Sequence, residues 1–427
     1  MKLDKRSTKK SIAQNLIYFG EKMIQQFLER RKKIFNQLQD KEAIVVFANA
    51  KPSYPRNFLQ DKNFFYLTGL NLPNAVYFFG KQNDKPIEML FIERNIPEMV
   101  VWEGAKMDKE EATKISGIER ISYLDEFERK IGLNIASLFK IFVNIGFNNI
   151  DKPLTKPQVF VNKVKEHFPH LTAMDLTKLM VPLRSIKSKW EVEQLQTAID
   201  VTGAAINKIY QTAQAGMKEY ELEAILRFHT TKNGLHHLGF SPIIATGKNA
   251  TTLHYEENNA KIGKNELVLL DVGVACNNYS ADISRTFPVS GTFTKRQKEV
   301  YTEVLAINKK IITMVKPGIG MKELNEKTVE LIQKSLIKLK LIKDKKNYQK
   351  YYMHSVGHHL GLDTHDLGAR DSVLGIGNVI TVEPGIYIAE EGIGVRIEDD
   401  ILVTKNGYKN LSENIPKEID ALENLCK

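Results

Sequence analysis

Apolar residues recur at helical spacing near the start of the chain and then gather into short runs. Residues 12–39 carry apolar side chains three, four or occasionally more positions apart, which predicts an amphipathic helix. Short apolar runs predict strands at residues 43–47, 64–67, 75–79, 87–92 and 141–145. A turn-rich segment at 80–84 joins the third and fourth runs into a predicted hairpin, and residues 162–167 lie in a further predicted helix. Because strands alternate with helices, we expect residues 1–182 to form an α/β domain.

The pattern changes around Pro182, which we expect to end the preceding helix ahead of a polar linker at residues 184–188. Ser188 carries a side chain suited to capping a long helix that extends to about Ile209. From residue 240 onward strand patterns dominate, and further helices are predicted near residues 219–231, 294–314 and 321–339. We therefore expect residues 183–427 to form an α+β domain with mostly antiparallel strands.

The charge distribution does not alter the predicted two-domain organisation. The chain of 427 residues has 61 Lys and Arg against 51 Asp and Glu, a formal net charge of +10. Residues 1–40 and 338–350 together hold the whole excess, so the rest of the chain is nearly neutral. A uniformly basic surface would indicate nucleic-acid binding, whereas two basic patches on a neutral body favour solvated helix faces. We expect no nucleic-acid partner.

Cysteine content and hydropathy narrow the class of protein. Two cysteines, Cys276 and Cys426, are too few for a disulfide framework or a Cys-rich zinc module, and they fit a reducing compartment. No apolar run approaches 18 residues, so we expect no membrane span. The apolar stretch at residues 16–19 is too short for a secretory signal. We expect a cytoplasmic protein; a mitochondrial presequence is the less favoured alternative.

Candidate chemistry begins with two acids in a predicted hairpin. Residues 266–274 and 279–287 are predicted strands joined by a polar turn. If Ala275 faces Asn278, then Asp271 lies directly across from Asp282, an arrangement that is destabilising for like charges. A buried carboxylate pair needs a cation or a raised pKa, and a metal ion is the simplest solution. The alternative is a surface hairpin with two unrelated acids.

A histidine cluster and two further acids add to this set. Four of the ten histidines lie within twelve residues, at His354, His358, His359 and His365. Neutral imidazole is a common metal ligand and can also donate a hydrogen bond to developing charge. Glu383 lies in an apolar strand, where an acid is unfavourable unless it is paired or ligating.

In the predicted strand 394–403, Glu398 and Arg396 share one face, which we expect to be polar and occupied. Charge balance then connects the acids. Two divalent cations match four carboxylates, which are Asp271, Asp282, Glu383 and Glu398. Oxygen ligands with one imidazole favour Mn²⁺, Co²⁺, Fe²⁺ or Zn²⁺ over a thiolate-type zinc site. A single-metal site is the alternative, but it leaves surplus buried acid.

Several ordered motifs contain these residues, and together they are specific. They are Leu269–Gly273 with Asp282–Phe287, His354–Asp366, Thr381–Tyr387, Arg396–Asp400, and the short segment Leu253–Tyr255. They resemble the dinuclear metallopeptidases of the pita-bread fold. From about residue 184 to residue 404 the chain is similar to aminopeptidase P, which is close to prolidase, and residues 61–69 resemble the N-terminal domain of these enzymes.

The resemblance implies a fold, an activity and a site. It implies a smaller α/β domain followed by a pita-bread catalytic domain that hydrolyses the Xaa-Pro bond at the N-terminus of peptides with proline at position two. The implied cofactors are two divalent ions, Mn²⁺ first, held by Asp271, Asp282, His358, Glu383 and Glu398. Glu383 is also implied to take a proton from water, His254, His354 and His365 to hold substrate, and Arg396 to orient the acids. A homo-oligomer is implied as well.

The resemblance leaves alternatives open. Prolidase, which cuts only Xaa-Pro dipeptides, shares every implied ligand, and the fourteen residues between Glu383 and Glu398 form a short loop also found in prolidase-like enzymes. A non-catalytic binding protein of the same fold is a second alternative. Such proteins usually lose ligands, and all five are present here.

Overall fold

The computed structural model describes residues 23–52, 58–146, 150–368 and 371–426. The chain divides into two units, Met1–Leu183 and Arg184–Lys427. Of the helix predicted at 12–39, the part before residue 23 lies outside the described residues, and the rest is helical through residue 37. Within the described residues, no helix is both long and apolar enough to cross a membrane.

A six-stranded mixed sheet organises the first unit, in the order β4-β3-β2-β1-β5-β6. Its strands are β1 (Glu42–Phe47), β2 (Val76–Gln82), β3 (Lys85–Ile92), β4 (Ile121–Tyr123), β5 (Lys140–Val143) and β6 (Thr172–Asp175). The predicted hairpin is confirmed as the antiparallel pair β2–β3, while β1–β5, β5–β6 and β3–β4 are parallel. The predicted strand at 43–47 is β1, and all six of its residues are buried.

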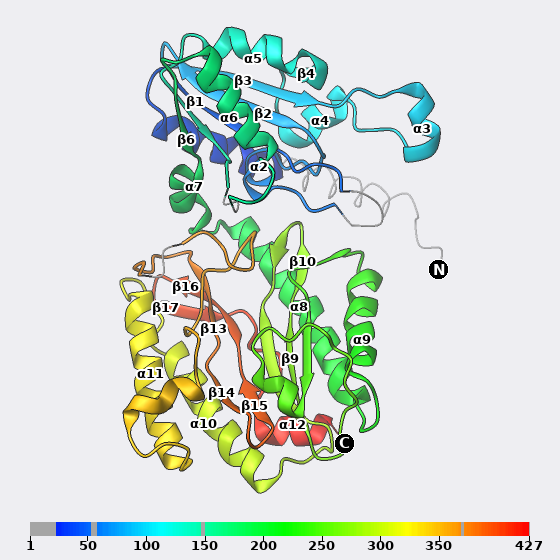
Figure 1. The fold of residues 1–427 in the computed structure, drawn as a ribbon, viewed down its shortest axis with the longest axis vertical. Coiled ribbons are helices and arrows are strands. Elements are labelled where there is room, and N and C mark those ends of the chain that lie inside the picture. The colour runs from blue at the N-terminus through cyan, green and yellow to red at the C-terminus, as the bar shows by residue number, and fades with distance from the viewer. Residues whose placement is uncertain (1–22, 53–57, 147–149, 369–370, 427) are drawn as a thin grey trace, which may run out of the picture. The chain divides into compact units, whose positions relative to one another are not determined.

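Helices cover the sheet of the first unit. They are helix 23–37, α2 (Lys62–Thr68), α3 (Pro97–Glu103), α4 (Lys109–Ser116), the 3₁₀ turn η1 (Leu124–Glu126), α5 (Phe127–Ile135), α6 (Lys156–His167) and α7 (Thr177–Arg184). Apolar side chains of α5 and α6 pack with β1 and β2 residues such as Val45 and Phe78 in one core cluster. The unit is therefore the expected α/β domain (Figure 1).

Two predictions about local structure in this region are wrong. The run Phe64–Leu67 is helical rather than extended, because Asp61 caps α2 by accepting from the Phe64 N–H at 2.8 Å and Gly69 ends it with φ of +72°. An apolar run of four residues does not by itself distinguish a buried helix from a strand. Pro182 does not end the preceding helix but lies inside α7, near the C-terminal end of that short helix.

The second unit has helices around four small antiparallel sheets. Its helices are α8 (Lys189–Thr212), α9 (Glu219–Lys232), α10 (Lys295–Ile312), α11 (Met321–Lys338) and α12 (Ile419–Leu425), with 3₁₀ turns η2 (Gly247–Thr251) and η3 (Lys345–Lys350). The Ser188 cap of α8 is confirmed. The Ser188 side chain accepts from the Glu191 N–H, and the Glu191 carboxylate accepts from the Ser188 N–H. In Figure 1, α9 lies at the right edge of this unit and α11 at its left edge, with the strands between them.

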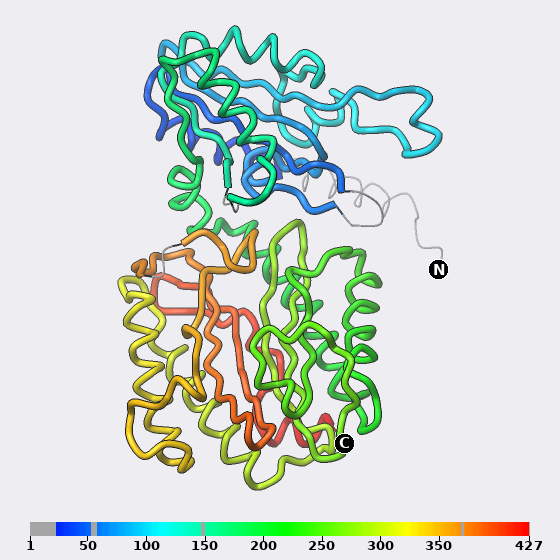
Figure 2. Tube along the Cα trace, in the orientation of Figure 1, coloured from blue at the N-terminus to red at the C-terminus, as the bar shows by residue number. Residues whose placement is uncertain are grey.

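The strands of this unit run antiparallel in every pairing that the described residues show. The sheets have the orders β12-β9-β8, β11-β10-β7, β13-β16-β17 and β14-β15. The strands are β7 (His237–Leu238), β8 (Ile243–Thr246), β9 (Leu267–Val272), β10 (Val274–Cys276), β11 (Tyr279–Ser280), β12 (Ile283–Pro288), β13 (Val379–Val382), β14 (Gly385–Ile388), β15 (Ile393–Arg396), β16 (Asp399–Thr404) and β17 (Gly407–Asn410). Figure 2 shows the chain path between them.

The expected register of the first acidic hairpin is wrong by two residues. Ala275 pairs with Ser280, not Asn278, because Asn277 and Asn278 both have positive φ and form the two-residue turn. Asp271 therefore pairs with Ser284. Asp282 is the diagonal neighbour of Asp271 on the same face, where long or charged side chains still interact.

The predicted continuous strand at 394–403 is also wrong. It is two strands, β15 and β16, which pair with different partners and are separated by Ile397 and Glu398. Arg396 and Glu398 are both buried, as expected for a polar face that is occupied. The break places Glu398 outside both assigned strands.

Removing the cap of α2 tests why this segment is helical. We expect Asp61→Ala to lower the free energy of unfolding by about 1 kcal/mol, because the Phe64 N–H loses its acceptor. Asp61→Ser, which keeps an acceptor oxygen, should lose clearly less. Urea denaturation of the three proteins measures the difference, and equal losses in both variants would contradict the capping role.

Candidate metal centre

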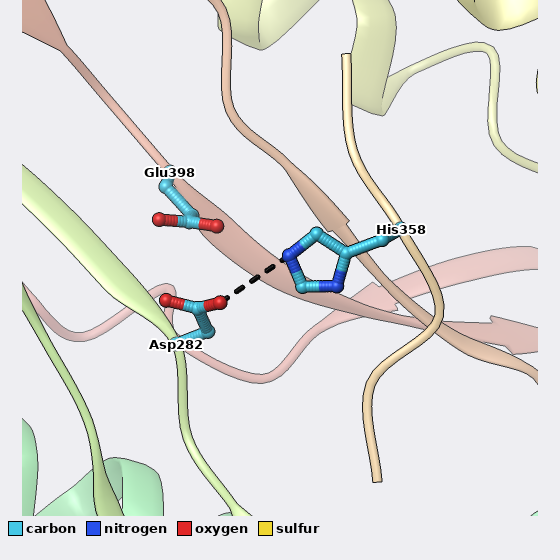
Figure 3. Close-up of side chains that lie close together, drawn as sticks. All are labelled: Asp282, His358 and Glu398. Carbon is cyan, nitrogen blue, oxygen red and sulfur yellow. Dashed lines mark ion pairs between the residues drawn. The ribbon is translucent and has the colours of Figure 1, made fainter. Parts of the chain in front are cut away.

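Three side chains from distant parts of the chain converge in the second unit. Asp282 lies between β11 and β12, His358 lies in the segment after η3, and Glu398 lies between β15 and β16. Their ligand atoms all lie within 4.8 Å of one another, and the two carboxylates are buried. Figure 3 shows the imidazole and both carboxylates directed toward a common point. These three side chains could hold a cation.

The His358 ring is held with one nitrogen directed at the acids. Its Nδ1 lies 3.0 Å from the His359 carbonyl, which can only accept, so Nδ1 carries a proton and Nε2 is the nitrogen turned toward the acids. Nε2 lies 3.3 Å from Asp282 Oδ2 and 3.6 Å from Glu383 Oε1. The segment is attached to β13, since the Thr381 N–H donates to the His358 carbonyl at 2.9 Å. Gly357 allows this approach, because a Cβ there would lie 2.1 Å from the Thr381 carbonyl oxygen.

Glu383 and Glu398 face each other at the end of one ladder. The last pair of β13 and β16 is Val382 with Asp399, so the next residues outward are these two glutamates. The Ile397 N–H donates to the Pro384 carbonyl at 3.3 Å, which continues the same alignment. Directly opposed acids, which the sequence had suggested for Asp271 and Asp282, therefore occur here instead.

Arg396 connects Asp271 to the other acids of the site. Its Oδ2 lies 2.6 Å from an Arg396 guanidinium nitrogen, whereas its buried Oδ1 has no hydrogen-bond partner among the described residues. Arg396 also donates to Ser284 Oγ at 2.8 Å and to the Tyr387 hydroxyl at 3.1 Å. Ser284 in turn donates to Glu398 at 2.7 Å. The arginine thus orients one acid directly and a second one through a hydroxyl.

The cluster carries more negative charge than its surroundings neutralise. Burial raises the pKa of Asp282 and Glu398 well above the usual carboxyl range, and nearby acids raise both further. Burial also raises the pKa of Glu383 to about 7, with His358 opposing the shift and Asp282 adding to it. Protonation or a bound cation is required to relieve such a cluster, and Arg396 alone does not suffice.

Of the remaining predicted histidines, His354 lies beside one of these acids and His365 beside His358. His354 Nε2 lies 2.8 Å from the Tyr387 hydroxyl, and its Nδ1 lies 3.8 Å from Glu383 Oε2. Burial and then the charge of Arg396 lower the pKa of His354 to about 4, so this ring is neutral at pH 7. The His365 ring lies 4.2 Å from the His358 ring, centroid to centroid. His254 is exposed, and its charge contributes to the lowered pKa of His354.

Comparison with known proteins identifies the family. The model of metallopeptidase family M24 matches residues 193–405, and that of the aminopeptidase P N-terminal domain matches residues 27–141. The Xaa-Pro aminopeptidase of Haemophilus influenzae is 33% identical over an alignment of 438 positions, which covers 96% of this chain and 99% of that protein. This chain belongs to the aminopeptidase P group of family M24.

Solved structures of aminopeptidase P share the fold. A structure from Bacillus anthracis, assigned provisionally to aminopeptidase P, has a TM-score of 0.91 at 40% identity and covers 94% of this chain and 98% of its own. Zinc-substituted Escherichia coli aminopeptidase P in complex with product has a TM-score of 0.87 at 29% identity, with the same coverage. The expectation of an α/β domain followed by a pita-bread catalytic domain is therefore confirmed.

The side chains of the site could hold a divalent metal ion. Asp271 Oδ1 is a buried acceptor with no hydrogen bond among the described residues, and His358 Nε2 lies among carboxylates. A donor set of carboxylate oxygens with one imidazole fits a divalent ion such as Mn²⁺ or Zn²⁺. The structure thus brings Asp282, His358 and Glu398 together, with Glu383 3.6 Å from His358 and Asp271 bonded to Arg396.

Two contacts of the site were missed by sequence reasoning. Ser284 links Arg396 to Glu398, and Tyr387 links Arg396 to His354. Both residues lie within the motifs already noted. Ser284 could have been found from its spacing, because it is two residues after Asp282 and therefore on the same strand face. Nothing local marks Tyr387, since its partner Arg396 is set by the pairing of β14 with β15.

The raised pKa of Glu383 predicts how metal-free protein responds to pH. Its folded pKa of about 7 exceeds the ordinary glutamate pKa of 4.5, so the folded state retains a proton that the unfolded chain releases. The stability of metal-free protein should therefore fall as pH rises from about 4.5 to about 7. We expect the melting temperature to drop by a few degrees, since about 1 kcal/mol corresponds to roughly 2–4 °C for a domain of this size.

Thermal melts in EDTA and in MnCl₂ between pH 5 and pH 8 measure this effect. Added Mn²⁺ should stabilise the protein more at pH 8 than at pH 5, because protons compete for the same carboxylates. Glu383→Gln removes one of the titrating groups and should reduce the slope in EDTA, leaving the part that comes from Asp282 and Glu398. A wild-type stability independent of pH in EDTA would contradict the assignment.

Proposed function

We propose that this protein is a metal-dependent aminopeptidase that hydrolyses the bond before a proline at position two and releases the N-terminal residue. The convergence of Asp282, His358 and Glu398 within 4.8 Å is the observation that carries the proposal. The named Xaa-Pro aminopeptidases that match along nearly the whole chain support the substrate class. The motif positions occupied here are those expected of an active member.

Two divalent ions are the proposed cofactors, and Mn²⁺ is the preferred metal. Asp271, Asp282, His358, Glu383 and Glu398 would hold them, and their four carboxylates would balance the charge of two such ions. When bound, the ions would supply an activated water and polarise the carbonyl of the scissile bond. The preference for Mn²⁺ is supported by a donor set dominated by carboxylate oxygen.

The remaining side chains would act on protons and orientation. Glu383 lies where it can accept a proton from the attacking water, and His354 is 3.8 Å from it. His354 is a neutral ring bonded to Tyr387, so it can interact with substrate without adding charge. Arg396 fixes Asp271 and, through Ser284, Glu398. His254 and His365 are proposed to contact substrate.

We also propose a cytoplasmic location, a homo-oligomeric state and no nucleic-acid or membrane partner. Cys276 and Cys426 are both free and buried, which suits a reducing compartment. In the lysine-rich segment, Lys338 pairs with Glu303 at 2.6 Å and Lys350 with Glu390 at 2.8 Å. These pairs reduce the charge available to a polyanion and favour a solvated face.

Substrate length separates this proposal from the prolidase alternative. We expect Mn²⁺-loaded protein to release the first residue from both Xaa-Pro dipeptides and tripeptides such as Xaa-Pro-Pro at comparable kcat/KM. Mass spectrometry of the products, with metal content measured on the same sample, checks this. Turnover of the dipeptide alone would indicate a prolidase, and no hydrolysis of either by metal-loaded protein would remove the proposed activity.

Two kinds of variant should separate metal ligation from substrate handling. Glu398→Ala and Asp271→Ala should leave activity near background and reduce bound metal, because each removes a carboxylate ligand. His354→Ala should keep its metal and lose about 10²–10³-fold in kcat, the usual effect of removing one hydrogen bond to developing charge. Metal analysis alongside kinetics measures both. Full metal and full rate in either carboxylate variant would overturn the ligand assignment.

A further inference from the structure

Asn308 is a buried amide behind the metal centre whose bonds are all accounted for. It lies in α10 and has no exposed surface. Its Nδ2 donates to the Val382 carbonyl at 3.1 Å and to the Ile397 carbonyl at 3.2 Å. Its Oδ1 accepts from Lys417 Nζ at 2.9 Å. The amide orientation is determined by chemistry, because carbonyls only accept and an ammonium only donates.

Each of the two carbonyls belongs to the peptide unit immediately before a proposed metal ligand. These ligands are Glu383 and Glu398. The Val382 carbonyl shares its peptide plane with the Glu383 N–H, which donates to the Val356 carbonyl at 2.8 Å. The Ile397 carbonyl shares its plane with the Glu398 N–H, which donates to the Ser284 carbonyl at 3.0 Å. Each peptide plane is therefore held on both sides, and the Asn308 side chain bonds both planes.

Charged groups hold the amide in turn. Lys417 pairs with Asp399, and Asp399 Oδ1 lies 2.9 Å from Arg285, which is also fully buried. Arg285 donates to the Glu398 carbonyl. Burial opposes charge on Asp399, but the two cations outweigh it and hold the pKa of its carboxyl well below the usual range. The Asn308 side chain thus joins a network that follows the backbone from residue 397 to residue 399.

We propose that Asn308 is a positioning residue for the metal centre, which fixes the separation of Glu383 and Glu398 by bonding the peptide unit in front of each. The inference rests on the proposed metal function. An apolar residue at this core position would avoid the cost of burying an amide, so the amide has a role beyond packing. Groups that orient ligands typically change metal affinity by about 10–100-fold when removed.

The test compares Asn308→Leu with a matched control in the other unit. Gln60 is also buried, and its Nε2 also donates to two backbone carbonyls, those of Leu70 at 3.1 Å and Leu72 at 2.8 Å. Gln60→Met therefore removes the same pair of bonds far along the chain from any proposed ligand. Both variants should melt at lower temperature than wild type.

Mn²⁺ binding separates the two variants. In titrations of metal-free protein followed by the electron paramagnetic resonance of free Mn²⁺, Asn308→Leu should bind about 10–100-fold more weakly. Gln60→Met should stay within about twofold of wild type. At saturating Mn²⁺, Asn308→Leu should lower kcat more than it changes KM, because the ligands and not the substrate contacts are displaced. Equal weakening in both variants, or wild-type affinity in Asn308→Leu, would overturn the inference.

A second variant covers the case in which Asn308→Leu does not fold. Asn308→Asp keeps the size of the side chain and the partner of Lys417 but loses both donors. Its added negative charge alone would strengthen cation binding, so weaker Mn²⁺ binding would report the lost donors. Unchanged or tighter binding would count against the inference. Wild-type protein that binds no Mn²⁺ would instead overturn the proposed metal function itself, so the two failures are distinguishable.

Discussion

The mutual repulsion of buried carboxylates is the constraint on which the catalytic unit depends. Asp282 and Glu398 lie almost fully out of water, Glu383 lies 3.6 Å from the same histidine, and Asp271 is bonded to Arg396. Fixed cations close to these acids, Arg396 foremost, neutralise part of this charge. Burial of ionised groups is so costly that the fold is fully stable only with protons or metal ions among them. The same buried negative charge is therefore neutralised by protons in the apo protein and by metal ions in the metal-bound enzyme.

The backbone places three of the four acids just outside the assigned strands, whereas Asp271 lies within β9. Asp282 lies in the gap between β11 and β12, Glu383 follows β13, and Glu398 lies in the gap between β15 and β16. Inside a regular ladder, side chains stand perpendicular to the sheet and diverge along it. At an interruption the chain can bend, so carboxylates from separate sheets can converge. Short strands in four sheets are thus the means by which this unit gathers its ligands.

The sequence predicted which residues form the candidate site better than it predicted the strand register that positions them. The acids and His358 could be found because a charged residue within an apolar run is costly and so indicates a role. The register between β9 and β12 could not, because it depends on the positive φ of Asn277 and Asn278, which shifts the pairing by two residues. Likewise, the segment Phe64–Leu67 can be recognised as helical only when its two capping residues, Asp61 and Gly69, are taken into account. Long-range bonds such as those of Tyr387 and Asn308 leave no local pattern at all.

The ion network beneath the ligands is better explained by geometry than by stability. A buried pair such as Arg285 with Asp399 loses much of its Coulomb energy to desolvation, and well-packed apolar residues in its place are often as stable or more so. Ion pairs and amides have directed bonds, whereas apolar contacts tolerate small shifts. Arg285 directs a bond to the Glu398 carbonyl, and Asn308 directs two to the peptide units of both glutamates. Because ligation depends on displacements of a few tenths of an ångström, directed bonds at this depth serve the metal centre more than they serve the fold.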